Sequence, residues 1–143
     1  VVRATFSAEL QAGCDAQDRG FLLTQIMHEI ATGQTSADRA RQLRECGGYV
    51  VPMCLYLDAL SVFAAITATF VKMPAENGVL VHLLFIRELL DHGVLHGLCW
   101  VDTRDMLADC LTKGAVERDV IHAVMSGEVP MSHACKFWRA KHL

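Results

Sequence analysis

The chain has 143 residues, of which 52% are hydrophobic and 20% are charged. This length suits one compact domain, and this composition excludes a wholly disordered chain. The formal net charge of -3 at pH 7 excludes a strongly basic nucleic-acid-binding domain, although it leaves room for local basic patches.

Targeting and membrane segments are not expected. No basic stretch followed by an apolar stretch opens the chain, so we predict no secretory signal peptide. The longest stretch without a charge or a histidine covers residues 59–71, which is shorter than the ~20 residues of a membrane-spanning helix. Because the first residue is Val1 rather than methionine, we expect a fragment of a longer, intracellular chain.

Six cysteines are present, and no two of them form a C-x-x-C pair. Thiols among apolar neighbours are typical of protein cores in a reducing compartment, so we do not expect a disulfide framework. The cysteines are Cys14, Cys46, Cys54, Cys99, Cys110 and Cys135.

The first predicted element is a long helix. Ser7 is a suitable N-cap residue. Apolar residues recur at helical spacing through Leu22, Ile26 and Ile30, and the pattern ends near Gly33. The next segment, residues 34–48, is polar and rich in arginine, which is compatible with either a short helix or a loop.

Strands and helices then alternate. Residues 53–58 predict a short buried strand, residues 59–71 a helix, and residues 73–78 a connection. Residues 79–90 predict an amphipathic helix that Gly93 ends. This alternation favours an α/β domain.

The C-terminal third begins with a second predicted strand over residues 95–102, which carries Trp100 toward the core. We expect Thr103 to cap a further helix that runs through Cys110 and ends at Gly114. Residues 116–125 predict one more helix. The tail from Gly127 mixes basic and aromatic residues and is expected to fray.

Three acids occupy informative positions. Glu9 lies in the first helix, Asp58 ends the first predicted strand, and Asp109 follows the second. Since ligands of α/β sheets bind at the carboxyl ends of strands, acids from separate elements can meet there. Clustered carboxylates repel one another, and a hard divalent cation such as Mg²⁺ removes that cost. Ordinary turn and cap chemistry is the alternative explanation for such acids.

Four ordered segments resemble one known family. They are residues 4–10 (ATFSAEL), 55–58 (LYLD), 85–88 (FIRE) and 103–113 (TRDMLADCLTK). This set is similar to the ribonuclease H domain of copia-type retrotransposon polyproteins. The last segment is the most specific of the four.

The resemblance implies a ribonuclease H-like α/β fold, with a mixed sheet flanked by helices and truncated at its N-terminus, so that the opening strands are missing. Residues 1–113 would form this partial domain, and residues 114–143 a C-terminal helix and tail. The family cleaves the RNA strand of RNA–DNA hybrids with two Mg²⁺ (or Mn²⁺) ions. By motif match, Glu9, Asp58 and Asp109 are the implied catalytic and metal-binding residues, while the family's first acid would precede Val1.

The same resemblance implies partners and a location. The partners would be an RNA–DNA hybrid and the upstream reverse transcriptase portion of the same polyprotein, in a cytoplasmic virus-like particle or in the nucleus. Two positions depart from the family pattern. Ala59 stands where the family often has Asn, and residues 77–80 lack the family's K-H-I-D segment. The alternative is therefore an inactive, decayed retroelement fragment that at most binds nucleic acid or protein.

Basic residues are the remaining candidates for substrate contact. Arg39, Arg41, Arg44 and Lys113 are predicted to contact a phosphate backbone. A solvated helix face is the alternative for the three arginines.

A zinc site is a further alternative. His92 and His96 stand four residues apart and Cys99 follows, and zinc takes His and Cys ligands. Gly93 is expected to end the helix between the two histidines, so they need not share a face.

Overall fold

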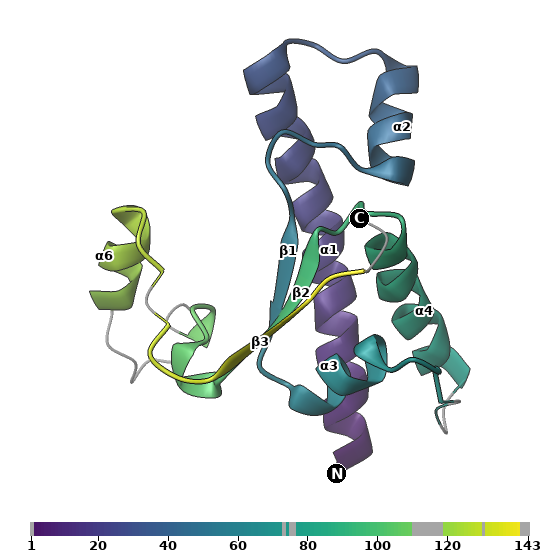
Figure 1. Cartoon of the computed structure of the whole chain (residues 1–143), viewed down its shortest axis with the longest axis vertical. Helices are drawn as coiled ribbons and strands as arrows, with labels where there is room; N and C mark the ends of the chain where they lie inside the picture. The colour runs from purple at the N-terminus through teal and green to yellow at the C-terminus, as the bar shows by residue number, and fades with distance from the viewer. Residues whose placement is uncertain (1, 73, 75–76, 110–118, 130, 141–143) are drawn as a thin grey trace.

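The computed structural model describes residues 2–72, 74, 77–109, 119–129 and 131–140. In chain order, its elements are α1 (Val2–Thr32), α2 (Ala37–Cys46), β1 (Cys54–Leu57), α3 (Leu60–Thr67), α4 (Asn77–Asp91), β2 (Gly97–Val101), the short 3₁₀ helix η1 (Thr103–Asp105), α6 (Asp119–Met125) and β3 (Cys135–Trp138). Figure 1 shows the long helix α1 running beside the sheet, with α4 next to it. Among the described helices, none combines the length and the apolarity needed to cross a bilayer.

The sheet is small and mixed, in the order β1-β2-β3. β1 and β2 are parallel, whereas β2 and β3 are antiparallel. A parallel pair needs a crossover connection, and α3 and α4 lie between β1 and β2 in the chain. The prediction of an α/β fold with a mixed sheet and flanking helices is therefore confirmed.

The core lies between the sheet and the helices α1, α3 and α4. Gly13 is the point at which α1 comes close to the sheet, because a Cβ there would touch Leu55, Leu57 and Ile86 at 3.7 Å. The strand register places Leu98 opposite Leu55 on this same face. Three buried side chains, from β1 and α4, thus pack against α1 at Gly13.

The other face of the sheet carries Tyr56, Cys99 and Phe137, which are cross-strand neighbours. Tyr56 and Phe137 are exposed, so this face is partly open. Val101, at the carboxyl end of β2, is buried on this face. It lines a pocket of about 280 Å³ together with Met106 and other side chains from residues 105–108, 129 and 131.

The helix α1 begins at Val2, so the prediction that Ser7 caps it was wrong. The apolar periodicity was also misleading, since the periodic side chains of its second half face solvent. The exposed residues are Leu22, Leu23, Ile26, Met27 and Ile30. The opposite face is buried although it includes polar Gln17, Thr24 and His28. His28 is satisfied there because its Nδ1 accepts the Val50 backbone N–H at 3.2 Å.

The sequence left open whether the arginine-rich segment, residues 34–48, is a short helix or a loop. In the structure, its middle part forms the helix α2. The Ser36 side chain accepts a hydrogen bond from the Arg39 backbone N–H, as an N-cap does. At the other end, Gly47 adopts a φ of 75° and its N–H donates to the Leu43 carbonyl.

The helix α3 ends at Thr67, four residues before the predicted end. Arg87 of α4 explains the early stop, because its Nη1 donates to the carbonyls of Ile66 at 2.7 Å and Ala68 at 2.8 Å. These bonds satisfy carbonyl groups that a longer helix would use itself. Ala68 has an extended ψ of 140°, which directs the chain out of the helix.

The region after β2 differs most from the prediction. Asp102, rather than Thr103, caps the following turn, which is the 3₁₀ helix η1. Helical backbone geometry returns at Asp109, the last described residue of that segment. Cys110 and Gly114, on the predicted helix, lie outside the described residues. The tail was predicted to fray, but residues 135–138 form β3, which pairs with β2.

Candidate functional site

Asp58 and Asp102 directly follow the two parallel strands. The register pairs Leu57 at the end of β1 with Trp100 near the end of β2. Both acids therefore leave the sheet at the same edge, where the carboxyl ends of parallel strands meet. In open α/β sheets, this edge is the usual place for a ligand.

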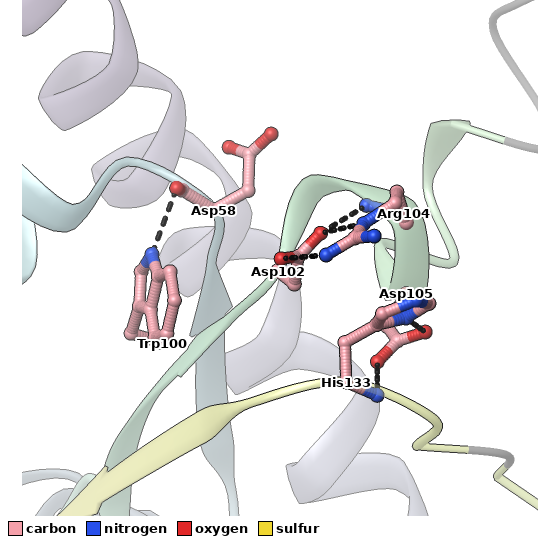
Figure 2. Close-up of polar contacts among 6 residues, drawn as sticks. All are labelled: Asp58, Trp100, Asp102, Arg104, Asp105 and His133. Carbon is pink, nitrogen blue, oxygen red and sulfur yellow. Dashed lines mark hydrogen bonds and ion pairs between the residues drawn. The ribbon is translucent and has the colours of Figure 1, made fainter.

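A side-chain hydrogen bond ties the two strand ends together. The Trp100 Nε1 donates to the backbone carbonyl of Asp58 at 2.9 Å. Figure 2 shows that the Asp58 carboxylate points away from this indole. Among the described residues, no hydrogen bond or ion pair engages the carboxylate oxygens of Asp58. The backbone of Asp58 is held while its acid group stays half-buried and accessible to a ligand.

Asp102 is bound by Arg104. Its Oδ1 accepts from the Arg104 backbone N–H at 3.0 Å and from Nε at 2.8 Å, and its Oδ2 accepts from Nη2 at 2.9 Å. These hydrogen bonds, together with the charge of the guanidinium, hold the pKa of Asp102 well below its usual range. Asp102 is thus an ionised group whose charge a neighbouring cation already balances.

Asp105 fixes His133, which lies 28 residues further along the chain. The Asp105 Oδ2 accepts the His133 backbone N–H at 2.7 Å, and Oδ1 lies 2.8 Å from the ring Nδ1 (Figure 2). Hydrogen bonding from His133 lowers the pKa of Asp105. The pair attaches the segment before β3 to η1 at the carboxyl edge of the sheet.

Glu9 lies on the face of α1 that contacts β1. It precedes Gly13 by one helical turn, and Gly13 meets Leu55 and Leu57. In Figure 1, the first turns of α1 lie at the same end of the molecule as the end of β1 that leads into α3. Glu9 itself is half-buried on this helix.

Asp109 follows a turn in which its backbone N–H donates to the Met106 carbonyl at 3.1 Å. It belongs to the segment after η1 and is half-buried. Within the described residues, no three His, Cys, Asp or Glu side chains form a group that could hold a metal ion. Glu9, Asp58 and Asp109 are thus placed on three separate elements without forming such a group.

The predicted phosphate-binding arginines all lie on α2. The Arg39 Nη1 donates to Gln42 Oε1 at 2.7 Å. Arg41 and Arg44 line a cleft beside α1 together with Asp18. Arg44 also places its guanidinium 5.4 Å from the centre of the Phe21 ring. Lys113 lies outside the described residues.

The two histidines of the zinc alternative are separated by a turn. Gly93 has a φ of 73°, which ends α4 as predicted. His92 lines a cleft between helices, whereas His96 precedes β2 and its backbone N–H donates to the Met53 carbonyl at 2.8 Å.

The sequence interpretation missed two of the contacts at this edge. Asp102 was placed only at the end of a strand, and an Arg two residues later was the available signal for the contact between Asp102 and Arg104. The contact between Asp105 and His133 had no local signal, because it depends on a tail strand that was not predicted.

None of the known protein families, curated proteins or solved structures compared with this chain matches it.

Proposed function

We propose that this chain is part of a ribonuclease H-like nuclease of a copia-type retrotransposon, which cleaves the RNA strand of RNA–DNA hybrids. The observation that carries the proposal is the position of Asp58, an accessible acid at the carboxyl edge of a parallel strand pair. The order of the elements supports it, since a helix bearing Glu9 precedes that strand pair. The resembling segments occur in the same order.

On this proposal, Glu9, Asp58 and Asp109 are the residues that hold Mg²⁺ or Mn²⁺. Their carboxylate oxygens are the donors these ions prefer. The donor chemistry fits these ions, although the three acids do not form a three-ligand group within the described residues. The proposal predicts both binding of the ion and cleavage of the hybrid, and the two are measured separately.

The proposed partners are an RNA–DNA hybrid and the reverse transcriptase portion of the same polyprotein, and the proposed place of action is inside the cell. The alternative is an inactive retroelement fragment that binds nucleic acid or protein without cleaving it.

Titration with Mn²⁺, followed by the paramagnetic loss of amide NMR signals, tests the metal site without requiring activity. We expect signals around residues 9 and 58 to vanish first, and Asp58→Asn to weaken Mn²⁺ binding roughly tenfold, since one ligand of the ion is lost. Asp91→Asn, an exposed acid on α4, serves as the control and should leave binding unchanged.

Cleavage is measured on a labelled RNA–DNA hybrid, with the 143-residue chain and with the longest natural protein that contains it. Cutting of the RNA strand that Asp58→Asn abolishes supports the nuclease. Hybrid binding without cutting in both proteins supports the alternative. If Mn²⁺ signals vanish elsewhere and Asp58→Asn changes nothing, the proposed site is wrong.

A further inference from the structure

A second candidate site lies at the other end of the molecule. A cleft of about 730 Å³ opens between α1, α2 and α4. It is lined by the last turn of α2 and the last turn of α4. His92, which also lines it, belongs to the connection between α4 and the start of β2. The cleft is therefore near the amino ends of the strands, whereas Asp58 follows the carboxyl end of β1. Its volume is typical of a site for a small ligand or for a few peptide side chains.

The floor of the cleft is apolar. Phe21 of α1 and Leu89 of α4 are buried, and Phe85 is half-buried beside them. This surface already accepts one cation from the chain itself, because the Arg44 guanidinium lies 5.4 Å from the centre of the Phe21 ring. Aromatic faces attract guanidinium and ammonium groups in this way.

The rim of the cleft is acidic. Asp18, Glu45 and Glu88 are exposed around the apolar floor. No ion pair joins any of these three carboxylates to another side chain in the described parts of the chain. The last turns of α2 and α4 add the negative ends of two helix dipoles. The lining of the cleft therefore carries three carboxylates and one guanidinium, that of Arg44.

We propose that this cleft binds a basic peptide segment in which arginine or lysine alternates with apolar side chains. The apolar side chains would pack on Phe21, Phe85 and Leu89. The cationic groups would reach the carboxylates of the rim. This complementarity argues against a nucleic acid as the occupant, because the rim would repel phosphate groups.

A backbone contact between the ends of α2 and α4 indicates that the cleft is formed before a ligand binds. A Cβ on Gly47, just after α2, would lie 2.5 Å from the Gly93 carbonyl oxygen, just after α4. The ends of the two helices are therefore in backbone contact. The walls of the cleft are set by this contact before any ligand arrives.

The probe for the test is the peptide acetyl-Leu-Arg-Leu-Arg-amide, titrated into the ¹⁵N-labelled chain. We expect amide shifts concentrated on residues 18–21, 44–46 and 85–92. The matched acidic peptide, acetyl-Leu-Glu-Leu-Glu-amide, should not shift them.

Substitutions then test the rim. Glu45→Gln and Glu88→Gln should each weaken peptide binding roughly two- to fivefold, as expected for the loss of one partly exposed charge pair, and the double variant roughly tenfold. Glu128→Gln, which changes the net charge equally at an exposed position outside the cleft, should leave the Kd unchanged.

Three results would overturn the proposal: unshifted amides at the cleft, equal binding of the acidic peptide, or stronger shifts at these residues with a short RNA than with the basic peptide. If a variant fails to fold, the comparison of the two peptides on the unmodified chain still decides. Because the probe contains no nucleic acid or metal, this test is independent of the proposed nuclease site.

Discussion

The indole of Trp100 donates a hydrogen bond to the backbone carbonyl of Asp58 across the two parallel strands, with 2.9 Å between Nε1 and the oxygen. This bond forms where the hydrogen-bond ladder of β1 and β2 ends. It therefore holds the backbone of the acid that the nuclease proposal needs most.

Trp100→Phe tests that bond. The change keeps an aromatic ring but removes the Nε1 donor and leaves the Asp58 carbonyl without this partner. We expect the free energy of unfolding to fall by about 1–2 kcal/mol, measured by urea denaturation. Trp138→Phe is the control, since Trp138 packs under Arg87 through its ring face and no hydrogen bond of its indole is found among the described residues. An equal loss in both variants would assign the effect to packing.

The Asp105 and His133 pair predicts a stability difference that depends on pH. Hydrogen bonding from His133 lowers the pKa of Asp105 below its ordinary value of 3.8. The ionised carboxylate therefore stabilises the folded chain above that value, and this contribution is lost as the pH falls through the lowered pKa. In thermal melts, the melting temperature of Asp105→Asn should be lower than that of the unmodified chain at pH 7. The difference between the two should shrink below about pH 4. A gap that stays constant with pH would show that charge is not involved.

We expect Arg87 to contribute far more to the free energy of unfolding than its ion pair with Asp91 does. Its Nη1 serves two carbonyls at the end of α3, and its guanidinium lies 5.2 Å from the centre of the Trp138 ring. Arg87→Lys cannot keep that geometry, and we expect a loss of about 1–3 kcal/mol. Asp91→Asn removes only the exposed ion pair at 3.4 Å and should cost less than about 0.5 kcal/mol. The reverse ranking in chemical denaturation would contradict this account.

Gly47→Ala should destabilise the chain and displace α2. The φ of 75° alone costs an alanine about 1–2 kcal/mol, and the new Cβ would also strike the Gly93 carbonyl. Gly33→Ala is a matched control, because Gly33 has a φ of 90° but no atom within 4 Å of its Cβ position. We expect the larger loss at Gly47, with amide shifts along α2. Equal losses of stability in the two variants would show that α2 moves away from the Gly93 carbonyl without a further loss of free energy.

Thiol reactivity should follow burial. Burial, aided by the charges of Asp15 and Asp18, raises the pKa of Cys14 to about 11, so few thiolates form there at pH 8. Cys46 and Cys135 are exposed. Pulsed iodoacetamide labelling with mass spectrometry should therefore modify these two first and Cys14 last among the five described cysteines. Early labelling of Cys14 would indicate that α1 opens away from the sheet.

Short-range signals predicted the elements correctly where the determinants are local. Gly33 and Gly93 end helices as expected because each adopts a positive φ there. The strands over residues 53–58 and 95–102 were located to within two residues, since apolar runs of that length suit a buried sheet.

The errors arose where distant contacts decide the structure. The end of α3 depends on Arg87, which lies 21 residues from Ile66. The pairing of β3 with β2 joins Trp138 to Leu98 across the chain. In the candidate site, the sequence located Asp58 at the end of a strand, but it gave no sign of the bond between Asp105 and His133.

The length of α1 has a consequence for both proposed sites. Because this helix is continuous from Val2 to Thr32, Glu9 and Phe21 are held about 18 Å apart along its axis, at 1.5 Å per residue. An extended peptide advances about 3.3–3.6 Å per residue, so a bound segment would need at least about five residues to bridge that distance. A shorter peptide anchored at Phe21 would leave the strand ends free for a second, simultaneous ligand.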